Sequence, residues 1–209
     1  MKPFAASSIP LVTVGVFILW LGWFGFNGGS QLAMGTFDDA VAVSNIFINT
    51  NLAACGGVLA AAIITRLMAG KTDVVQMLNG AIGGLVAVTA EPLAPAPIAA
   101  IFIGAIGGII VVFGTKLLFN FKIDDVVGAV PAHLFAGIWG TLAVPLTNSD
   151  ANFSAQLIGV LSINAFVFVV AYIVWAIMKN TMGIRLSKEA ELKGTDVTET
   201  GVIAYAIRD

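Results

Sequence analysis

Charged residues are scarce in this chain, and cysteine and histidine occur once each. Asp, Glu, Lys and Arg make up 11% of the 209 residues, whereas about a quarter of a soluble domain is charged. The single cysteine, Cys55, excludes an intrachain disulfide and a site built on several thiolates, and we interpret it as a small buried hydrophobe. No carboxylate or second histidine stands at metal-ligand spacing from His133, so we expect neither a metal nor a cofactor.

Long apolar runs are abundant where charged residues are scarce, and hydrophobic residues make up 58% of the chain. A membrane-spanning helix needs about 20 mostly apolar residues. Segments that meet or approach this length are 9–33, 40–65, 75–90, 97–115, 126–147 and 156–178. The sequence therefore predicts an all-α polytopic membrane protein with six transmembrane helices. Its opening, MKPFAASSIP, is not typical of a cleavable signal peptide, so we expect the first helix to be retained.

Three of the connections between these segments contain no basic residue. They carry only acids, namely Asp38 and Asp39, Glu91, and Asp150. All 10 lysines and arginines fall before the first segment, in the two other connections, or after the sixth segment. Because basic residues of short loops are retained in the cytoplasm, this alternation predicts that both termini are cytoplasmic.

The composition changes near Gly183. Residues 1–183 read as one transmembrane domain, in which two GAIGG segments at 80–84 and 104–108 predict close helix packing. Residues 184–209 are polar and of mixed charge, which predicts a cytoplasmic C-terminal tail with one short helix at 187–193.

His133 lies well inside the fifth apolar segment. Ionisable groups at membrane depth are costly and usually face a pathway or a partner. Pro131, two residues earlier, favours a broken helix, which is tolerated at membrane depth where it lines a cavity. We favour a pore-lining role for His133, and the alternative is a core histidine bonded to a neighbouring helix.

Two further groups of residues have alternative interpretations. Asp124 and Asp125 precede the histidine segment, where they favour an N-terminal helix cap over a direct role with a cation. Trp23, Phe26 and Ser30 share one face at helical spacing. That face is equally consistent with an aromatic belt at the membrane interface and with a cation site near the outer mouth of a pore.

Five stretches together resemble the ammonium transporter (Amt/Rh) family, in its bacterial Amt branch. They are WFGFNGGS, DDAVAVSNIFINTNLAACGG, NGAIGGLVAVTAEP, IDDVVGAVPAHLFAGIWGT and the tail GTDVTETGVIAY. The likeness covers residues 4–205 but only the C-terminal half of the family pattern, its sixth to eleventh spans. It implies half of a fold built from inverted repeats.

The resemblance assigns roles to single residues. His133 matches one of two pore histidines, Phe26 one of two gating phenylalanines, and Ser30 the serine of the outer ammonium site. Trp23 matches a pore-lining tryptophan that also borders this site, and Asp124 and Asp125 match the family's acidic pair. The partner histidine, the other gating phenylalanine and the aspartate of the outer site belong to the half of the pattern that is not matched.

The resemblance implies a partial transporter in the bacterial inner membrane that conducts ammonia past His133, and not an enzyme. An intramembrane hydrolase is disfavoured because Cys55 lies on another helix without activating neighbours. The resemblance implies a homotrimer in the full assembly, a PII signal protein at the cytoplasmic tail, and no nucleic-acid partner. The tail fits the family pattern at Gly194, Asp196, Glu199, Gly201 and Tyr205, but TETG replaces a common histidine before the glycine. The alternatives are an ammonium-sensing or regulatory subunit and an inactive fragment.

Overall fold

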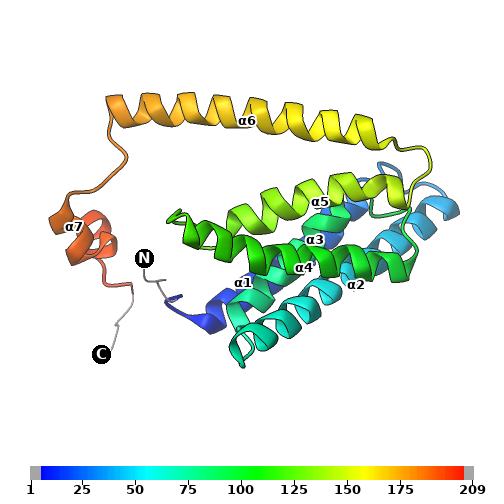
Figure 1. The fold of residues 1–209 in the computed structure, drawn as a ribbon, viewed down its shortest axis with the longest axis horizontal. Coiled ribbons are helices and arrows are strands. Elements are labelled where there is room, and N and C mark those ends of the chain that lie inside the picture. The colour runs from blue at the N-terminus through cyan, green and yellow to red at the C-terminus, as the bar shows by residue number, and fades with distance from the viewer. Residues whose placement is uncertain (1–5, 205–209) are drawn as a thin grey trace. The chain divides into compact units, whose positions relative to one another are not determined.

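A computed structural model describes residues 6–204 of the chain, and within that range the secondary structure is entirely helical. The elements are α1 (Ile9–Gly29), α2 (Phe37–Ala69), α3 (Val74–Thr89), α4 (Pro97–Asn120), η1 (Val130–Phe135), α5 (Ala136–Ala143), η2 (Val144–Leu146), α6 (Phe153–Thr181), α7 (Lys188–Lys193) and η3 (Asp196–Thr200) (Figure 1). The chain forms two compact units, Met1–Val160 and Leu161–Asp209.

Each predicted apolar segment is helical, which confirms the all-α membrane architecture. Four of the described helices, α1, α2, α4 and α6, are long and apolar enough to cross a membrane. The two other apolar segments, Val74–Thr89 and Val130–Leu146, form shorter helical stretches. The first of them has 16 residues, close to the lower limit of about 17 for a straight span.

Local capping chemistry explains why α2 is longer than the predicted 40–65 segment. The Thr36 side chain accepts from the backbone N–H of Asp39, and the Asp39 carboxylate accepts from the backbone N–H of Thr36, so the helix begins at a capping box. The helix ends at Gly70, which adopts a left-handed conformation with φ of 70°. Hydropathy alone missed both ends because the first and last turns contain polar residues.

Helices α2, α3 and α4 form the core, and their glycines bring the backbones into direct contact. The two GAIGG segments face each other: a Cβ on Gly107 would lie 2.5 Å from the carbonyl oxygen of Gly83. On α4, Gly104 abuts the Ala53 carbonyl and Gly108 abuts the Gly57 carbonyl. The predicted close packing is therefore confirmed. It suits a lipid environment, where van der Waals contact between backbones holds helices together.

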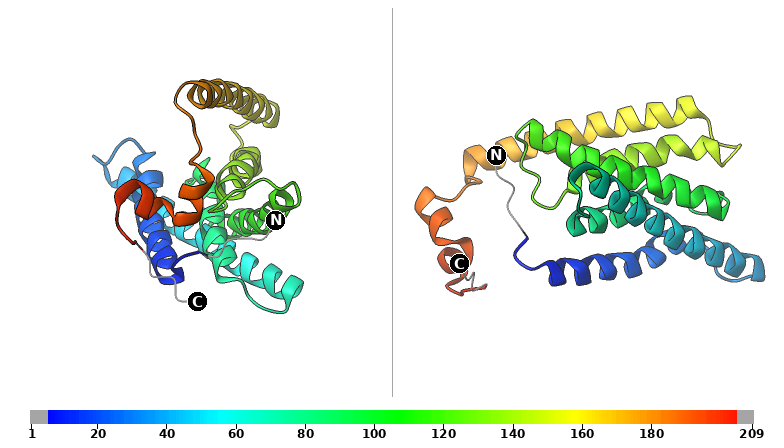
Figure 2. Two further views of the ribbon diagram at one scale, coloured as in Figure 1. Left: turned by 90° about the vertical axis from the view of Figure 1, so that its left-hand side faces the viewer. Right: turned by 60° about the horizontal axis from the view of Figure 1, so that its bottom comes forward.

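The remaining elements of the first unit pack on this core from two directions. Helix α1 contacts α2 and α3, whereas η1 and α5 contact α3 and α4 (Figure 2). Both α1 and η1 therefore pack against α3. Packing of α1 is looser, since a Cβ placed on Gly15, Gly22 or Gly25 would meet nothing within 4 Å.

The second unit contains most of α6, from Leu161 onward, and the polar tail. The short helix predicted at 187–193 is present as α7, capped by the Ser187 side chain on the Ala190 N–H. Arg185 pairs with Glu191 at 2.5 Å, and both side chains are exposed. Hydrogen bonds from the backbone N–H groups of Ala204 and Val197 lower the pKa of the Asp196 carboxyl. Tyr205 lies outside the described residues.

We predict opposite stability effects for alanine at two glycines. Gly108→Ala places a Cβ against the Gly57 carbonyl and destabilises the bundle by about 1–3 kcal/mol, the usual cost of overpacking. Gly22→Ala, the matched control on α1, meets open space. It is neutral or stabilising by up to about 1 kcal/mol because alanine favours helix. Thermal unfolding of the two variants in detergent measures the difference, and equal midpoints would contradict the packing described here.

Candidate functional site

Trp23 is anchored to α3 by its indole nitrogen. The Nε1–H donates to Thr89 Oγ1 at 2.7 Å, and the Thr89 hydroxyl donates in turn to the Leu85 carbonyl oxygen at 2.7 Å. An indole in an apolar bundle needs a partner for its one donor, and this chain of two hydrogen bonds supplies it. The orientation of the Trp23 ring is therefore set by α3 as well as by α1.

The anchored indole lies against His133. The two ring centroids are 6.4 Å apart with an interplanar angle of 23°. Trp23 also makes an edge contact with Phe26, at 6.0 Å between centroids and 64° between planes. Three of the predicted site residues, Phe26, Trp23 and His133, thus form one row of aromatic rings, called the aromatic row below. Its Trp23–His133 contact joins α1 to η1 through side chains.

The helix that carries His133 is distorted, as the sequence predicted from Pro131. Val130–Phe135 forms a π-helical turn, in which the Ala136 N–H donates to the carbonyl of Pro131, five residues earlier. Such turns occur frequently at functional sites because the widened backbone changes the direction of side chains. Gly114 of α4 packs against Pro131 and Phe135, so the distorted turn rests on the core.

Asp125 caps the start of this helix. Its carboxylate oxygens accept from the backbone N–H groups of Ala129 at 2.9 Å and Val130 at 2.8 Å. Asn79 of α3 donates to the Val127 carbonyl at 3.0 Å, beside Gly128, whose φ is +76°. The loop that leads to His133 is therefore fixed by polar contacts at its base. Asp124 is exposed, and none of these contacts involves it.

The C-terminal end of α1 carries Phe26, and Ser30 follows it as the helix cap. Phe26 is 66% exposed. Ser30 is exposed as well, caps the helix, and donates to the Phe26 carbonyl over a long 3.4 Å. The structure brings the Phe26 ring to Trp23, whereas Ser30 contacts only the backbone of Phe26 through this hydrogen bond.

Buried polar residues on α1 and α2 were not predicted from the sequence. Asn27 is fully buried, and its Nδ2 donates to Thr50 Oγ1 at 3.0 Å. The neighbouring Gly28 packs on the Phe47 ring. This pair sets the rotation of α1 about its axis, and so the direction of Phe26. A polar residue inside an apolar run was the available signal.

The arrangement presents a hydrogen-bonding imidazole on an apolar face. His133 is exposed in this chain, and no other residue in the range 6–204 forms a hydrogen bond with its imidazole. A neutral imidazole has one donor and one acceptor nitrogen. Together with the indole beside it, His133 offers a small polar solute a partner along a wall that is otherwise aromatic and aliphatic.

These features define a class: a polytopic helical membrane protein with a distorted helix that carries one histidine beside anchored aromatic residues. Comparison with known proteins narrows the class. The sequence matches the profile of the Ammonium Transporter Family over residues 1–205. It is 37% identical to the ammonium transporter Amt2 of Archaeoglobus fulgidus over 95% of this chain, and 40% identical to a putative ammonium transporter of Synechocystis over 90%.

Solved structures agree with the sequence comparison. The fold is similar to that of a protein described as a sensor Amt protein, with a TM-score of 0.85 and 30% identity over 92% of this chain. It is also similar to Mep2 of Candida albicans, with a TM-score of 0.75 and 27% identity over 89% of this chain. The chain belongs to the ammonium transporter family, which is a family of transporters, and it is a multi-pass membrane protein.

The chain spans about half the length of the relatives it matches, 46% of the Archaeoglobus protein and 44% of the Synechocystis protein. Relatives of similar identity come from both archaea and bacteria. The comparisons therefore show the family, whereas assignment to its bacterial branch stays a prediction.

We predict that the Trp23–Thr89 hydrogen bond contributes to the stability of the first unit. Thr89→Val keeps the shape of the side chain but leaves the indole N–H without its acceptor, which costs about 1–3 kcal/mol. Thr89→Ser keeps the hydroxyl and loses less. A double-mutant cycle with Trp23→Phe, followed by thermal unfolding in detergent, isolates the pair. A coupling near zero would show that the 2.7 Å contact carries no net energy.

Proposed function

We propose that this chain forms one wall of a path that carries ammonia across the membrane, as a partial Amt-type transporter. His133, Trp23 and Phe26 line the path. The observation that carries the proposal is the exposed imidazole of His133, stacked on Trp23 at 6.4 Å. Ammonia is small and neutral, and it both donates and accepts hydrogen bonds, so a neutral imidazole suits it.

The apolar surroundings supply selectivity in this proposal. A bare cation loses its hydration on entering a dry path, and an unpaired charge in a medium of low dielectric constant is very costly. Ammonium therefore releases its proton before the narrow part of the path. We assign the outer ammonium site to Ser30 and Trp23, with Phe26 as one side of the gate, because aromatic faces attract ammonium-type cations. Asp124 and Asp125 belong to the support of the histidine helix.

Orientation and assembly complete the proposal. The distribution of basic residues supports cytoplasmic termini in a bacterial inner membrane. In that orientation, residues 1–183 form the transmembrane domain and residues 184–209 the cytoplasmic tail. We propose a homotrimer as the full assembly. The tail, with its Arg185–Glu191 pair and its Asp196-centred turn, is the proposed contact for a PII signal protein.

A second candidate is an ammonium-sensing subunit. It is favoured by the similarity to a protein whose description names it a sensor, with a TM-score of 0.85. A sensor uses the outer site to bind ammonium and transmits occupancy through its tail, so removal of residues 184–209 abolishes signalling and leaves ligand binding intact. A transporter half, by contrast, requires His133 for flux.

For His133 we predict a loss of transport when it is changed. In an assembly completed by a family first half, His133→Ala lowers methylammonium uptake about tenfold or more, the equivalent of one lost hydrogen bond of roughly 1.5 kcal/mol. Trp175→Leu on α6, outside the aromatic row, is the control and keeps uptake near the parent level. Unchanged uptake in His133→Ala at equal protein levels would show that His133 only packs.

For the topology we predict accessibility from outside at two of three positions. In a Cys55→Ala background, single cysteines replace Thr36, Ser149 and Thr72, all of them exposed. An impermeant thiol reagent added to intact cells labels the first two and not the third, because Thr72 follows Lys71 in a basic connection. Labelling at Thr72 in intact cells would reverse the proposed orientation.

A further inference from the structure

The connection between α3 and α4, residues 90–96, is held against α2 by a buried amide. Asn49 is 2% exposed, and its Nδ2 donates to the carbonyl oxygens of Pro92 at 3.0 Å and Pro95 at 2.8 Å. An amide nitrogen has two hydrogens, so Asn49 can use both of them on this connection. Proline also holds its own φ near −65°, which stiffens the backbone further. The connection therefore has one set position against α2.

Glu91 joins this connection to a second one. One of its carboxylate oxygens accepts from the backbone N–H groups of Leu93 and Ala94, both at 3.2 Å. The other accepts from Asn148 Nδ2 at 2.9 Å, across 57 residues of sequence. Asn148 lies between η2 and α6, and its Oδ1 accepts from the backbone N–H of Asp150 at 2.9 Å. Because hydrogen bonds to an ionised acceptor are roughly twice as strong as neutral ones, the Glu91–Asn148 contact is a strong link between the two connections.

The Glu91–Asn148 contact joins the ends of the two elements that hold the aromatic row. Glu91 follows Thr89, the acceptor of the Trp23 indole N–H, by two residues. Asn148 follows η2, the last turn of the helical stretch that carries His133, by two residues. Both connections lie at the same end of the first unit (Figure 1). Trp23 and His133 are therefore attached to opposite sides of one contact.

This contact has no second hydrogen bond beside it. Gly140 brings α5 against α3, since a Cβ there would lie 2.4 Å from the Ala87 carbonyl oxygen. Past that point, among residues 6–204, the Glu91–Asn148 contact is the one hydrogen bond between the connections 90–96 and 147–152. Without it, packing alone holds the last turn of α3 to the histidine helix.

We propose that Glu91 and Asn148 are positioning residues that keep the Trp23 indole stacked on His133. They act through Thr89, whose hydroxyl moves with the last turn of α3 and carries the indole with it. This positioning follows from the hydrogen bonds and needs no transport. Its consequence for ammonium rests on the proposed function, in which Trp23 borders the outer ammonium site, so a displaced indole weakens binding there.

An exchange of donor and acceptor tests the contact itself. Glu91→Gln sets an amide against the Asn148 amide, and Asn148→Asp sets a second carboxylate against Glu91, so each single change leaves a group of the contact unpaired. The double variant restores the hydrogen bond in the reverse direction, because the introduced amide donates to the introduced carboxylate. The matched control is Asn152→Asp, which adds the same charge to the same connection. Asn152 caps α6 through the N–H groups of Ser154 and Ala155, and aspartate keeps that cap.

Fluorine NMR of the full chain labelled with 5-fluorotryptophan reports the surroundings of Trp23 without any transport. The Trp23 resonance is assigned by its absence in Trp23→Phe. We expect each single variant to shift it, the double variant to return it to the parent position, and Asn152→Asp to leave it in place. The Trp175 resonance stays fixed throughout, which excludes general unfolding. An unshifted Trp23 resonance in both single variants, or a shift that the double variant fails to reverse, would overturn the proposal.

Methylammonium uptake in an assembly completed by a family first half tests the consequence. Each single variant raises the apparent KM about fivefold, part of the roughly tenfold or greater factor that a hydrogen bond to a charged group contributes. The maximal rate changes less than about twofold, because Asp125 still caps the start of the histidine helix. The double variant restores the parent KM.

The two readouts separate this proposal from the proposed function. A parent assembly without uptake would refute the proposed function, and the fluorine resonances would still decide the positioning. Parent uptake with an unchanged KM in both single variants would show that the contact does not position the ammonium site, and would overturn that part of the proposal.

Discussion

Direct contact between the backbones of α2, α3 and α4 is the constraint on which the rest of the first unit depends. Glycines of α3 and α4 face carbonyl groups of neighbouring helices at distances that no Cβ permits. In a membrane this contact replaces the hydrophobic driving force that holds a soluble bundle together. Helix α3 takes part in these contacts, and it supplies both the Thr89 hydroxyl that orients Trp23 and the Asn79 amide that donates to the loop before His133.

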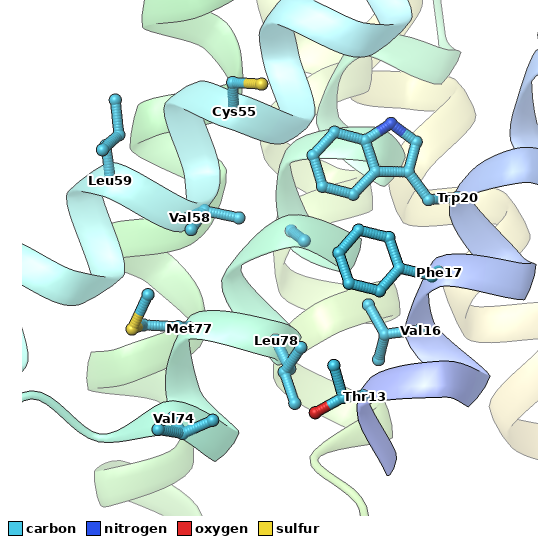
Figure 3. Close-up of a pocket in the computed structure, with 11 residues that line it drawn as sticks. Thr13, Val16, Phe17, Trp20, Cys55, Val58, Leu59, Val74, Met77 and Leu78 are labelled. Carbon is cyan, nitrogen blue, oxygen red and sulfur yellow. The ribbon is translucent and has the colours of Figure 1, made fainter. Parts of the chain in front are cut away.

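The site follows from this platform through a few polar contacts. The Thr89 hydroxyl orients the Trp23 indole, and the Asp125 carboxylate caps the helix that carries His133. The π-helical turn at Val130–Phe135 directs His133 toward Trp23. Each contact satisfies a group that would otherwise be costly in an apolar bundle. The looser packing of α1 has the opposite consequence, because it leaves a cavity between α1, α2 and α3 that Phe17 and Trp20 line (Figure 3). Helix α3 is thus packed tightly against α4 and more loosely against α1.

Much of the fold could be predicted from the sequence, because long apolar runs, GAIGG spacing and the proline before His133 are local signals. The contacts that build the site were less accessible. Trp23 and Thr89 are 66 residues apart, and Asn79 and Val127 are 48 apart, so no local pattern joins them. Helices that are apolar on all sides also give no periodicity that tells one face from another. The buried Asn27 was visible as a polar residue in an apolar run, but its partner Thr50 was not.

The central claim is that the Trp23–His133 face is one wall of an ammonia path and needs a second wall. Reconstitution in liposomes tests it most directly, with an internal pH indicator to follow ammonia entry after an ammonium gradient is applied. The account predicts no flux above empty liposomes for this chain alone, and clear flux when a family first half is reconstituted with it. Robust flux from the chain alone, or none from the assembled pair at full incorporation, would contradict the account.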